Sequence, residues 1–190
     1  MTYDALGDGV TFLTRPLEAD TEVTGPMVAR LWISSATADA DLFVRLRVLD
    51  PAGEEVVFHD RVAEAFSHVF GANFPPHPIA CGWLRASHRK LDPARSLPWR
   101  PYHAHDQVQP LTPGEVYQLD VEVLPTAIVV PAGYRLALSI AGHDYGLHDV
   151  PENRPPEVFG GKVTVHAGGA RPSHLLLPIV PPSESSEATS

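Results

Sequence analysis

Alternation of apolar and polar positions is clearest between residues 41 and 49. The even positions are apolar: Leu42, Val44, Leu46 and Val48. The odd positions include Asp41, Arg45 and Arg47, so this spacing of two predicts a half-buried β-strand with one solvated face. The turn sequence Asp50-Pro51-Ala52-Gly53 follows. A strand over 55–58 is therefore expected to pair back as a hairpin.

Further segments of the chain are expected to be strands, and several of them show the same alternation. They are 10–14, 27–34, 116–124, 127–130, 134–140, 163–166 and 174–180. Gly25-Pro26 is read as a turn before the second of these, and Pro125 as a break between 116–124 and 127–130. Apolar residues at helical spacing between Asp60 and Gly71 predict one short helix.

Composition supports an all-β fold. The 190 residues include 20 prolines and 14 glycines, which end helices and shape turns. Short strands joined by irregular connections indicate a two-sheet, jelly-roll β-sandwich. A chain of this length fits one domain, since domains span on the order of 100–200 residues. We expect that domain over 1–182, followed by a disordered polar tail over 183–190.

Charge and cysteine content limit the classes of partner and the cellular location that we expect. Fourteen basic and 23 acidic residues give a formal net charge of −9, which argues against a nucleic-acid or anionic-membrane partner. No apolar segment approaches the roughly 20 residues that cross a bilayer. Cys81 is the single cysteine, so no intrachain disulfide can form, and the opening residues lack the apolar run of a signal peptide. A cytoplasmic location is expected.

Residues 82–106, called the arm here, are rich in Arg, His, Trp and Pro. They follow neither the strand periodicity nor the helix periodicity cleanly. The basic residues of the arm could form a solvated, salt-bridged face or bind an anion. Aromatic residues interleaved with arginine instead favour a protein contact. The expected interface residues are Trp83, Arg85, His88, Arg89, Trp99, Arg100 and Tyr102.

No catalytic residue is expected in this chain. A serine hydrolase of the α/β type carries its nucleophile in a Gly-x-Ser-x-Gly turn, and no serine here has that setting. Ser87 and Ser139 are interpreted as structural. Cys81 lies between Ile79 and Trp83, which are too large for a tight nucleophile turn, so it too is interpreted as structural.

His103-Ala104-His105 is the one metal-like motif, because cupin barrels hold a metal with a His-x-His pair on one strand. A cupin would add a Glu shortly afterwards, where this chain has Gln109 and Pro110, and a later His. His143, Asp144 and His148 could in principle complete such a site. Because two of the four expected ligands are missing, His103 and His105 are weak candidates, and we expect no metal or other cofactor.

Four segments of the sequence resemble the C-terminal domain of X-Pro dipeptidyl-peptidases and of cocaine-esterase-like and α-amino-acid-ester hydrolases. They are 12–35, 82–105 with its LRASHR motif, 111–144 with its PGE, PTA and AGYRLAL elements, and 154–181. The resemblance implies a jelly-roll sandwich related to galactose-binding-like folds, which follows an α/β-hydrolase domain and packs on it. It also implies that the catalytic Ser, Asp and His belong to that preceding domain, which is expected to lie outside this chain.

The resemblance therefore implies a non-catalytic domain that helps to shape the active-site rim of a hydrolase. The partner would be an α/β-hydrolase domain, in cis or as a separate chain, and a homo-oligomer is possible. The parent substrate could be an ester, a β-lactam precursor or an X-Pro peptide. The alternative is an independent carbohydrate- or small-ligand-binding module, in which Trp83, Trp99, Tyr102 and Tyr145 would stack on a ring.

Overall fold

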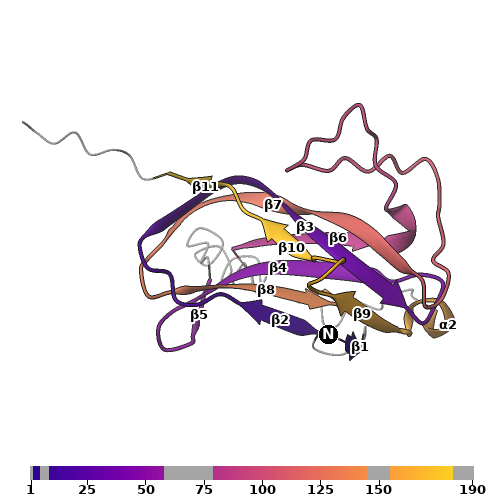
Figure 1. Ribbon diagram of the computed structural model, residues 1–190, viewed down its shortest axis with the longest axis horizontal. Coiled ribbons are helices and arrows are strands. Elements are labelled where there is room, and N and C mark those ends of the chain that lie inside the picture. Colours follow the sequence, from indigo (N-terminus) through magenta and orange to yellow (C-terminus); the bar gives the residue numbers. More distant parts are fainter. Residues whose placement is uncertain (1, 5–8, 58–78, 145–154, 182–190) are drawn as a thin grey trace, which may run out of the picture.

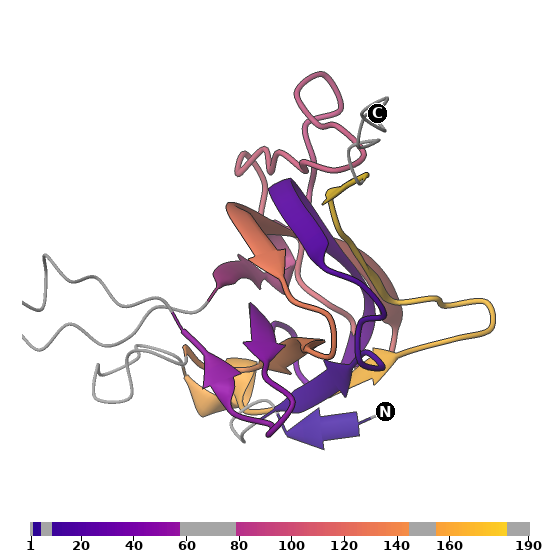
Figure 2. The same cartoon turned by 90° about the vertical axis from the view of Figure 1, so that its left-hand side faces the viewer.

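The computed structural model describes residues 2–4, 9–57, 79–144 and 155–181, and shows two antiparallel β-sheets packed face to face (Figures 1 and 2). The first sheet contains β1 (Thr2–Asp4), β3 (Thr21–Ser35), β7 (Val116–Val130), β9 (Lys162–His166), β10 (His174–Leu176) and β11 (Ile179–Val180). The second contains β2 (Val10–Leu13), β4 (Asp41–Leu49), β5 (Glu55–Val56), β6 (Ala80–Arg85) and β8 (Arg135–Ala141).

Each sheet is built around one central strand. In the first sheet, β3 pairs with β7 along one edge and with β9, β10 and β11 in succession along the other, and β1 pairs with β9. In the second sheet, β4 pairs with β8 along one edge and with β6 and β5 along the other, and β2 pairs with β8. The all-β, two-sheet sandwich is thereby confirmed, while a jelly-roll order of strands stays a prediction.

The core lies between the sheets and consists of the inward residues of the alternating strands. Fully buried examples are Met27, Leu31 and Ile33 from β3, Leu42, Val44 and Leu46 from β4, and Leu119, Val121 and Val123 from β7. Burying one such side chain contributes about 1.5–3 kcal/mol to the free energy of folding. Burial of the apolar positions of the alternating strands is therefore the main source of stability. The outer face of β4 is less solvated than expected, because Arg45 and Arg47 are half-buried against Glu55.

Two prolines that were read as strand breaks instead lie in a bulge between β3 and β7. The register shifts from Gly25 opposite Thr126 to Met27 opposite Val123. One residue of β3, Pro26, therefore faces two residues of β7. A proline is tolerated where a bulge already interrupts the ladder of hydrogen bonds, so both strands continue through this point.

Other boundaries also differ from the expectations. The 174–180 segment forms two strands, β10 and β11, because Pro178 interrupts it. The strands β1 and β6 and the short helix α2 (Pro156–Phe159) were not predicted. The predicted β4–β5 hairpin is confirmed, with Gly53 N donating to Asp50 O over 3.0 Å. The helix predicted between Asp60 and Gly71 and the tail at 183–190 lie outside the described residues.

Within the described ranges, no helix combines the length and the apolar character that crossing a membrane requires.

Candidate functional site

The arm leaves the second sheet at β6, passes through the 3₁₀ turn η1 (Ala86–His88) and projects beyond the sheets before the chain returns to β7 (Figures 1 and 2). Its first four residues are therefore regular strand, contrary to the expectation of an irregular segment. β6 keeps an alternating pattern with Ala80, Gly82 and Leu84 buried. Gly82 has no space for a side chain, because a Cβ atom there would collide with the Glu122 carbonyl of β7.

The base of the arm is fixed by buried and half-buried polar contacts. The Asp39 carboxylate accepts hydrogen bonds from Ala40 N and Ser87 N, each over 2.9 Å. The Arg89 guanidinium donates to the carbonyls of Ala86 and Gln109 and lies 4.5 Å over the Tyr117 ring. These contacts hold both ends of the arm against the sandwich.

The far end of the arm is a braced hairpin with an apolar tip. Leu97 and Arg100 exchange both backbone hydrogen bonds, over 2.9 and 3.0 Å, so Pro98 and Trp99 form a two-residue turn. Behind it, Arg95 donates to the Tyr102 hydroxyl over 2.9 Å and lies 5.0 Å over that ring. These contacts restrain the backbone of the turn that carries the exposed Trp99 side chain.

Six of the seven predicted interface residues divide into two groups, and the seventh, His88, lines the pocket described below. Arg85 and Arg89 stabilise the domain itself. Arg85 forms a two-pronged ion pair with Asp41 over 2.8 and 2.9 Å and lies 4.5 Å over Phe159. The hydrogen bond to Asp41 raises the pKa of Arg85. Trp83, Trp99 and Tyr102 are in contrast 64%, 49% and 41% exposed, and the Arg100 side chain is 62% exposed and 3.8 Å from Glu122.

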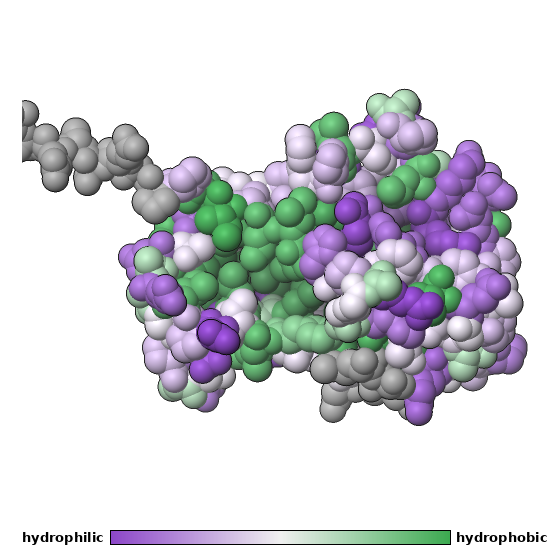
Figure 3. All heavy atoms as spheres, viewed as in Figure 1, coloured by the Kyte–Doolittle hydropathy of each residue, from purple (hydrophilic) through white to green (hydrophobic). Residues whose placement is uncertain are grey.

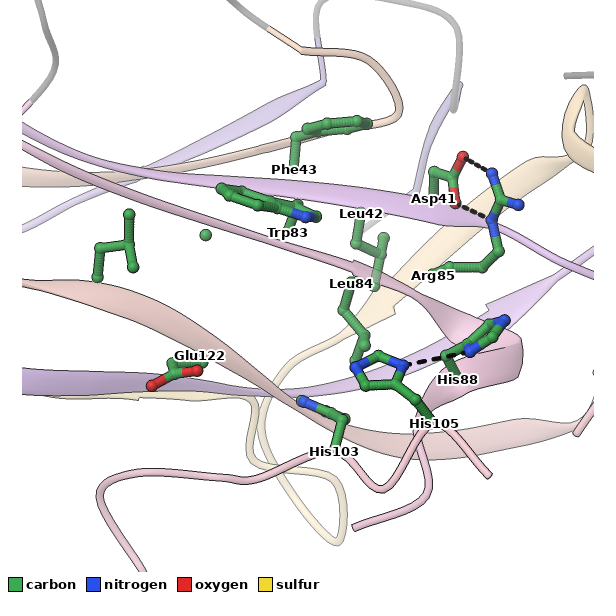
Figure 4. Close-up of a pocket in the computed structure, with 12 residues that line it drawn as sticks. Asp41, Leu42, Phe43, Trp83, Leu84, Arg85, His88, His103, His105 and Glu122 are labelled. Carbon is green, nitrogen blue, oxygen red and sulfur yellow. Dashed lines mark hydrogen bonds and ion pairs between the residues drawn. The ribbon is translucent and has the colours of Figure 1, made fainter. Parts of the chain in front are cut away.

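A pocket of about 570 Å³ opens between β4, β6, β7 and the base of the arm (Figure 4). Its lining includes Trp83, Arg85 and His88 from the predicted interface set, together with the metal candidates His103 and His105. Trp99, Arg100 and Tyr102 are not among the residues that line it. Sequence reasoning missed Asp41 and Glu122, which reach the same pocket from β4 and β7. No local sequence pattern marks them, because the pairing of β4 with β6 and the packing of β7 against β6 bring them there.

The three histidines of the pocket lie close together without forming a metal cage. The Nδ1 atoms of His88 and His105 are 3.3 Å apart, and the ring centroids of His103 and His105 are 6.0 Å apart. The premise of a His-x-His strand is wrong, because His105 has a left-handed φ of 51°. No three His, Cys, Asp or Glu side chains in the described ranges, which include His143 and Asp144, are grouped to hold a metal ion. His148 lies outside those ranges.

The remaining nucleophile candidates are in structural settings. Ser87 and Ser139 are both 2% exposed, and the Ser139 hydroxyl bonds the Thr11 hydroxyl over 2.7 Å. Burial raises the pKa of the half-buried Cys81 thiol, which disfavours the reactive thiolate. These positions agree with the interpretation of Ser87, Ser139 and Cys81 as structural residues.

A second apolar surface lies over β10 and β11, where Figure 3 shows hydrophobic side chains gathered around a hollow. Ile179 is 57% exposed there, and Leu176 is 42% exposed. The adjoining groove of about 290 Å³ is lined by Phe12, Leu138, Leu175 and Leu177. The sequence analysis did not identify this surface, because its residues come from β2, β8 and β10, which are far apart in the chain.

Comparison with known proteins places the chain in a family. Residues 2–176 match the family described as the X-Pro dipeptidyl-peptidase C-terminal non-catalytic domain. A Mycobacterium bovis protein named "Putative serine esterase" is 32% identical over 178 residues, which are 91% of this chain and 24% of that protein. The cocaine esterase of a Rhodococcus species is 22% identical over 181 residues, 91% of this chain and 26% of the esterase.

Solved structures support the same relationship. A CocE/NonD family hydrolase from Staphylococcus aureus aligns with a TM-score of 0.77 and 30% identity, over 95% of this chain and 32% of the hydrolase. The chain thus spans about a quarter of the length of the two named relatives and about a third of the solved hydrolase. The chain belongs to the family of X-Pro dipeptidyl-peptidase C-terminal non-catalytic domains.

Proposed function

We propose that this chain is the non-catalytic β-sandwich of a serine hydrolase of the X-Pro dipeptidyl-peptidase and cocaine-esterase type. In this proposal it packs on an α/β-hydrolase domain and helps to shape the rim of that domain's active site. The observation that carries the proposal is the family match over 2–176. The names of the relatives, an esterase and a hydrolase several times longer than the matched part, support it.

The arm is the proposed docking face. Trp83, Trp99 and Tyr102 offer large apolar side chains on a backbone that is already held in place. Trp and Tyr dominate the binding energy of protein interfaces, and a fixed backbone lowers the entropy lost on binding. Arg100 and His88 would lie beside these anchors, whereas Arg85 and Arg89 would act indirectly by keeping the arm in shape. The domain would thereby position substrate without making or breaking bonds.

The test is reconstitution with a catalytic domain from the family that lacks its own C-terminal domain. Binding is measured by calorimetry and activity with an ester substrate. We expect a saturable complex with higher activity or thermal stability than the catalytic domain alone. Trp99→Ala should weaken binding at least about tenfold, the loss typical of a buried interface tryptophan.

Ile179→Ala is the matched control, because Ile179 is similarly exposed on the second apolar surface. It should leave the affinity unchanged. Weakening by Ile179→Ala with no effect of Trp99→Ala would contradict the choice of the arm, and the absence of any complex would contradict docking itself. A cytoplasmic location and a homo-oligomer stay predictions.

The second candidate function is an independent carbohydrate- or small-ligand-binding module. One observation favours it: the exposed Trp83 borders a pocket that also contains His105 and Glu122, and an aromatic face beside polar groups suits a sugar ring. A glycan array followed by calorimetry would detect such a ligand. Saturable binding lost in Trp83→Ala would support this function, and no signal would leave docking as the proposal.

A further inference from the structure

Two histidines at the base of the arm contact each other through like atoms. His88 lies in η1 at the start of the irregular part of the arm, and His105 lies near its end. Their Nδ1 atoms are 3.3 Å apart and their ring centroids 5.5 Å (Figure 4). An Nδ1 atom donates when it carries a proton and accepts when it does not. The contact therefore requires one protonated and one unprotonated Nδ1.

The backbone holds His105 in this position. Its φ of 51° makes it the one residue other than glycine with a left-handed φ in the described ranges. Its neighbours are tied to Lys90, since Ala104 N donates to the Lys90 carbonyl and Asp106 pairs with the Lys90 ammonium, each over 2.9 Å. The imidazole contact thus joins the outgoing and returning ends of the arm.

Each acidic side chain near the pair has a basic side chain beside it. Among the groups that line the pocket, Asp41 is paired with Arg85, and Glu122 lies 3.8 Å from Arg100. Beside the pair, Lys90 and Asp106 neutralise each other. His103 is the remaining titratable group, and burial together with the nearby His105 lowers its pKa.

We propose that His88 and His105 form a proton-dependent clamp that keeps the outgoing and returning ends of the arm together. The clamp is closed when the pair is neutral or carries one positive charge. When both imidazoles are charged, two N–H groups and two like charges face each other, and the contact breaks. The open state binds more protons, so the closed population falls as the pH falls. Histidine side chains in general change charge between about pH 5 and 8, so the test compares the two ends of that range.

Amide hydrogen exchange of the 190-residue chain tests the clamp directly. Exchange across 88–106 is measured at pH 7.5 and pH 5.0 and corrected for the intrinsic pH dependence of the rate. We expect protection of this segment to fall about tenfold at pH 5.0, while the core strands β3 and β4 change little. His88→Gln and His105→Asn should remove this pH-dependent loss of protection, called the step below, since neither amide side chain titrates. Asn is chosen at residue 105 because it tolerates the left-handed backbone there.

Two control variants separate the clamp from other histidines. His174→Gln alters a histidine on β10, and His103→Gln alters the neighbour in the pocket. Both variants should keep the step. A flat profile in the wild-type chain, a step that persists in His88→Gln and His105→Asn, or a step lost in His103→Gln would overturn the proposal.

The clamp needs no partner, so its failure would leave the docking proposal untouched. Because Trp99 and Tyr102 lie on the clamped segment, weaker docking at pH 5.0 is a further consequence, and that part rests on the proposed function.

Discussion

Gly82 shows how one residue without a side chain sets the shape of the site. It lies on β6, where the edge of the second sheet passes against β7 of the first. Gly82 directly precedes Trp83, and both residues line the pocket at the base of the arm. The close approach of the two strands brings Glu122 and Trp83 to one pocket, so a glycine that weakens the strand signal in the sequence is required for the site.

Gly82→Ala is expected to destabilise the domain by about 2 kcal/mol or more, because the new methyl group would meet the Glu122 backbone, which cannot move aside as a flexible side chain can. Gly53→Ala is the control. Its φ is 90° and no atom lies within 4 Å of the added methyl group, so only backbone strain of about 1 kcal/mol is expected. Urea titration followed by circular dichroism measures both, and equal stabilities of the two variants would refute the close approach.

Arginine residues of the arm illustrate why residue type alone does not identify an interface. Arg85 and Arg100 look equivalent in the sequence. In the structure the Arg85 guanidinium donates hydrogen bonds to both carboxylate oxygens of Asp41, while the Arg100 side chain is 62% exposed. An arginine that already satisfies its donors internally contributes to stability and offers less to a partner.

At the scale of elements, the arm depends on Arg89. Arg89→Lys is expected to lower the free energy of unfolding by about 1–2 kcal/mol, because lysine keeps the charge but loses the planar contact with Tyr117 and one of two carbonyl bonds. Exchange across 88–106 should rise at neutral pH as well. Arg15→Lys, at an exposed position outside the strands, should change neither quantity. Equal effects of the two substitutions would show that the arm is held by other contacts.

Strands with regular alternation could be predicted from the sequence, and segments shaped by distant contacts could not. The bounds of β4 agree with the prediction because its buried side is uniformly aliphatic. β6 was missed since Gly82 interrupts its apolar side, and Pro26 and Pro125 were misread because a bulge depends on the partner strand. Likewise, the arm could be recognised as an interface candidate from its composition. The pocket of the arm could not be predicted, because its walls come together through the pairing of β4 with β6 and the packing of β7, from the other sheet, against β6.

At the scale of the whole molecule, charge and apolar surface make different contributions. The formal net charge of the chain is −9, yet the proposed docking anchors are aromatic. The second apolar surface over β10 and β11 is hydrophobic at its centre (Figure 3). Whichever surface a hydrolase domain covers, burial of apolar area should supply most of the binding energy.

The affinity of the chain for a family catalytic domain is therefore expected to change by less than about threefold between 0.05 and 0.5 M NaCl. Salt shortens the Debye length from about 14 to about 4 Å over this range and weakens contacts between exposed charges, while burial of aromatic side chains is little affected. Calorimetry at both salt concentrations measures the change, and Arg100→Ala should make the remaining salt dependence smaller still. A loss of tenfold or more in the wild-type chain would mean that charge pairing holds the complex, with the arm aromatics in a minor role.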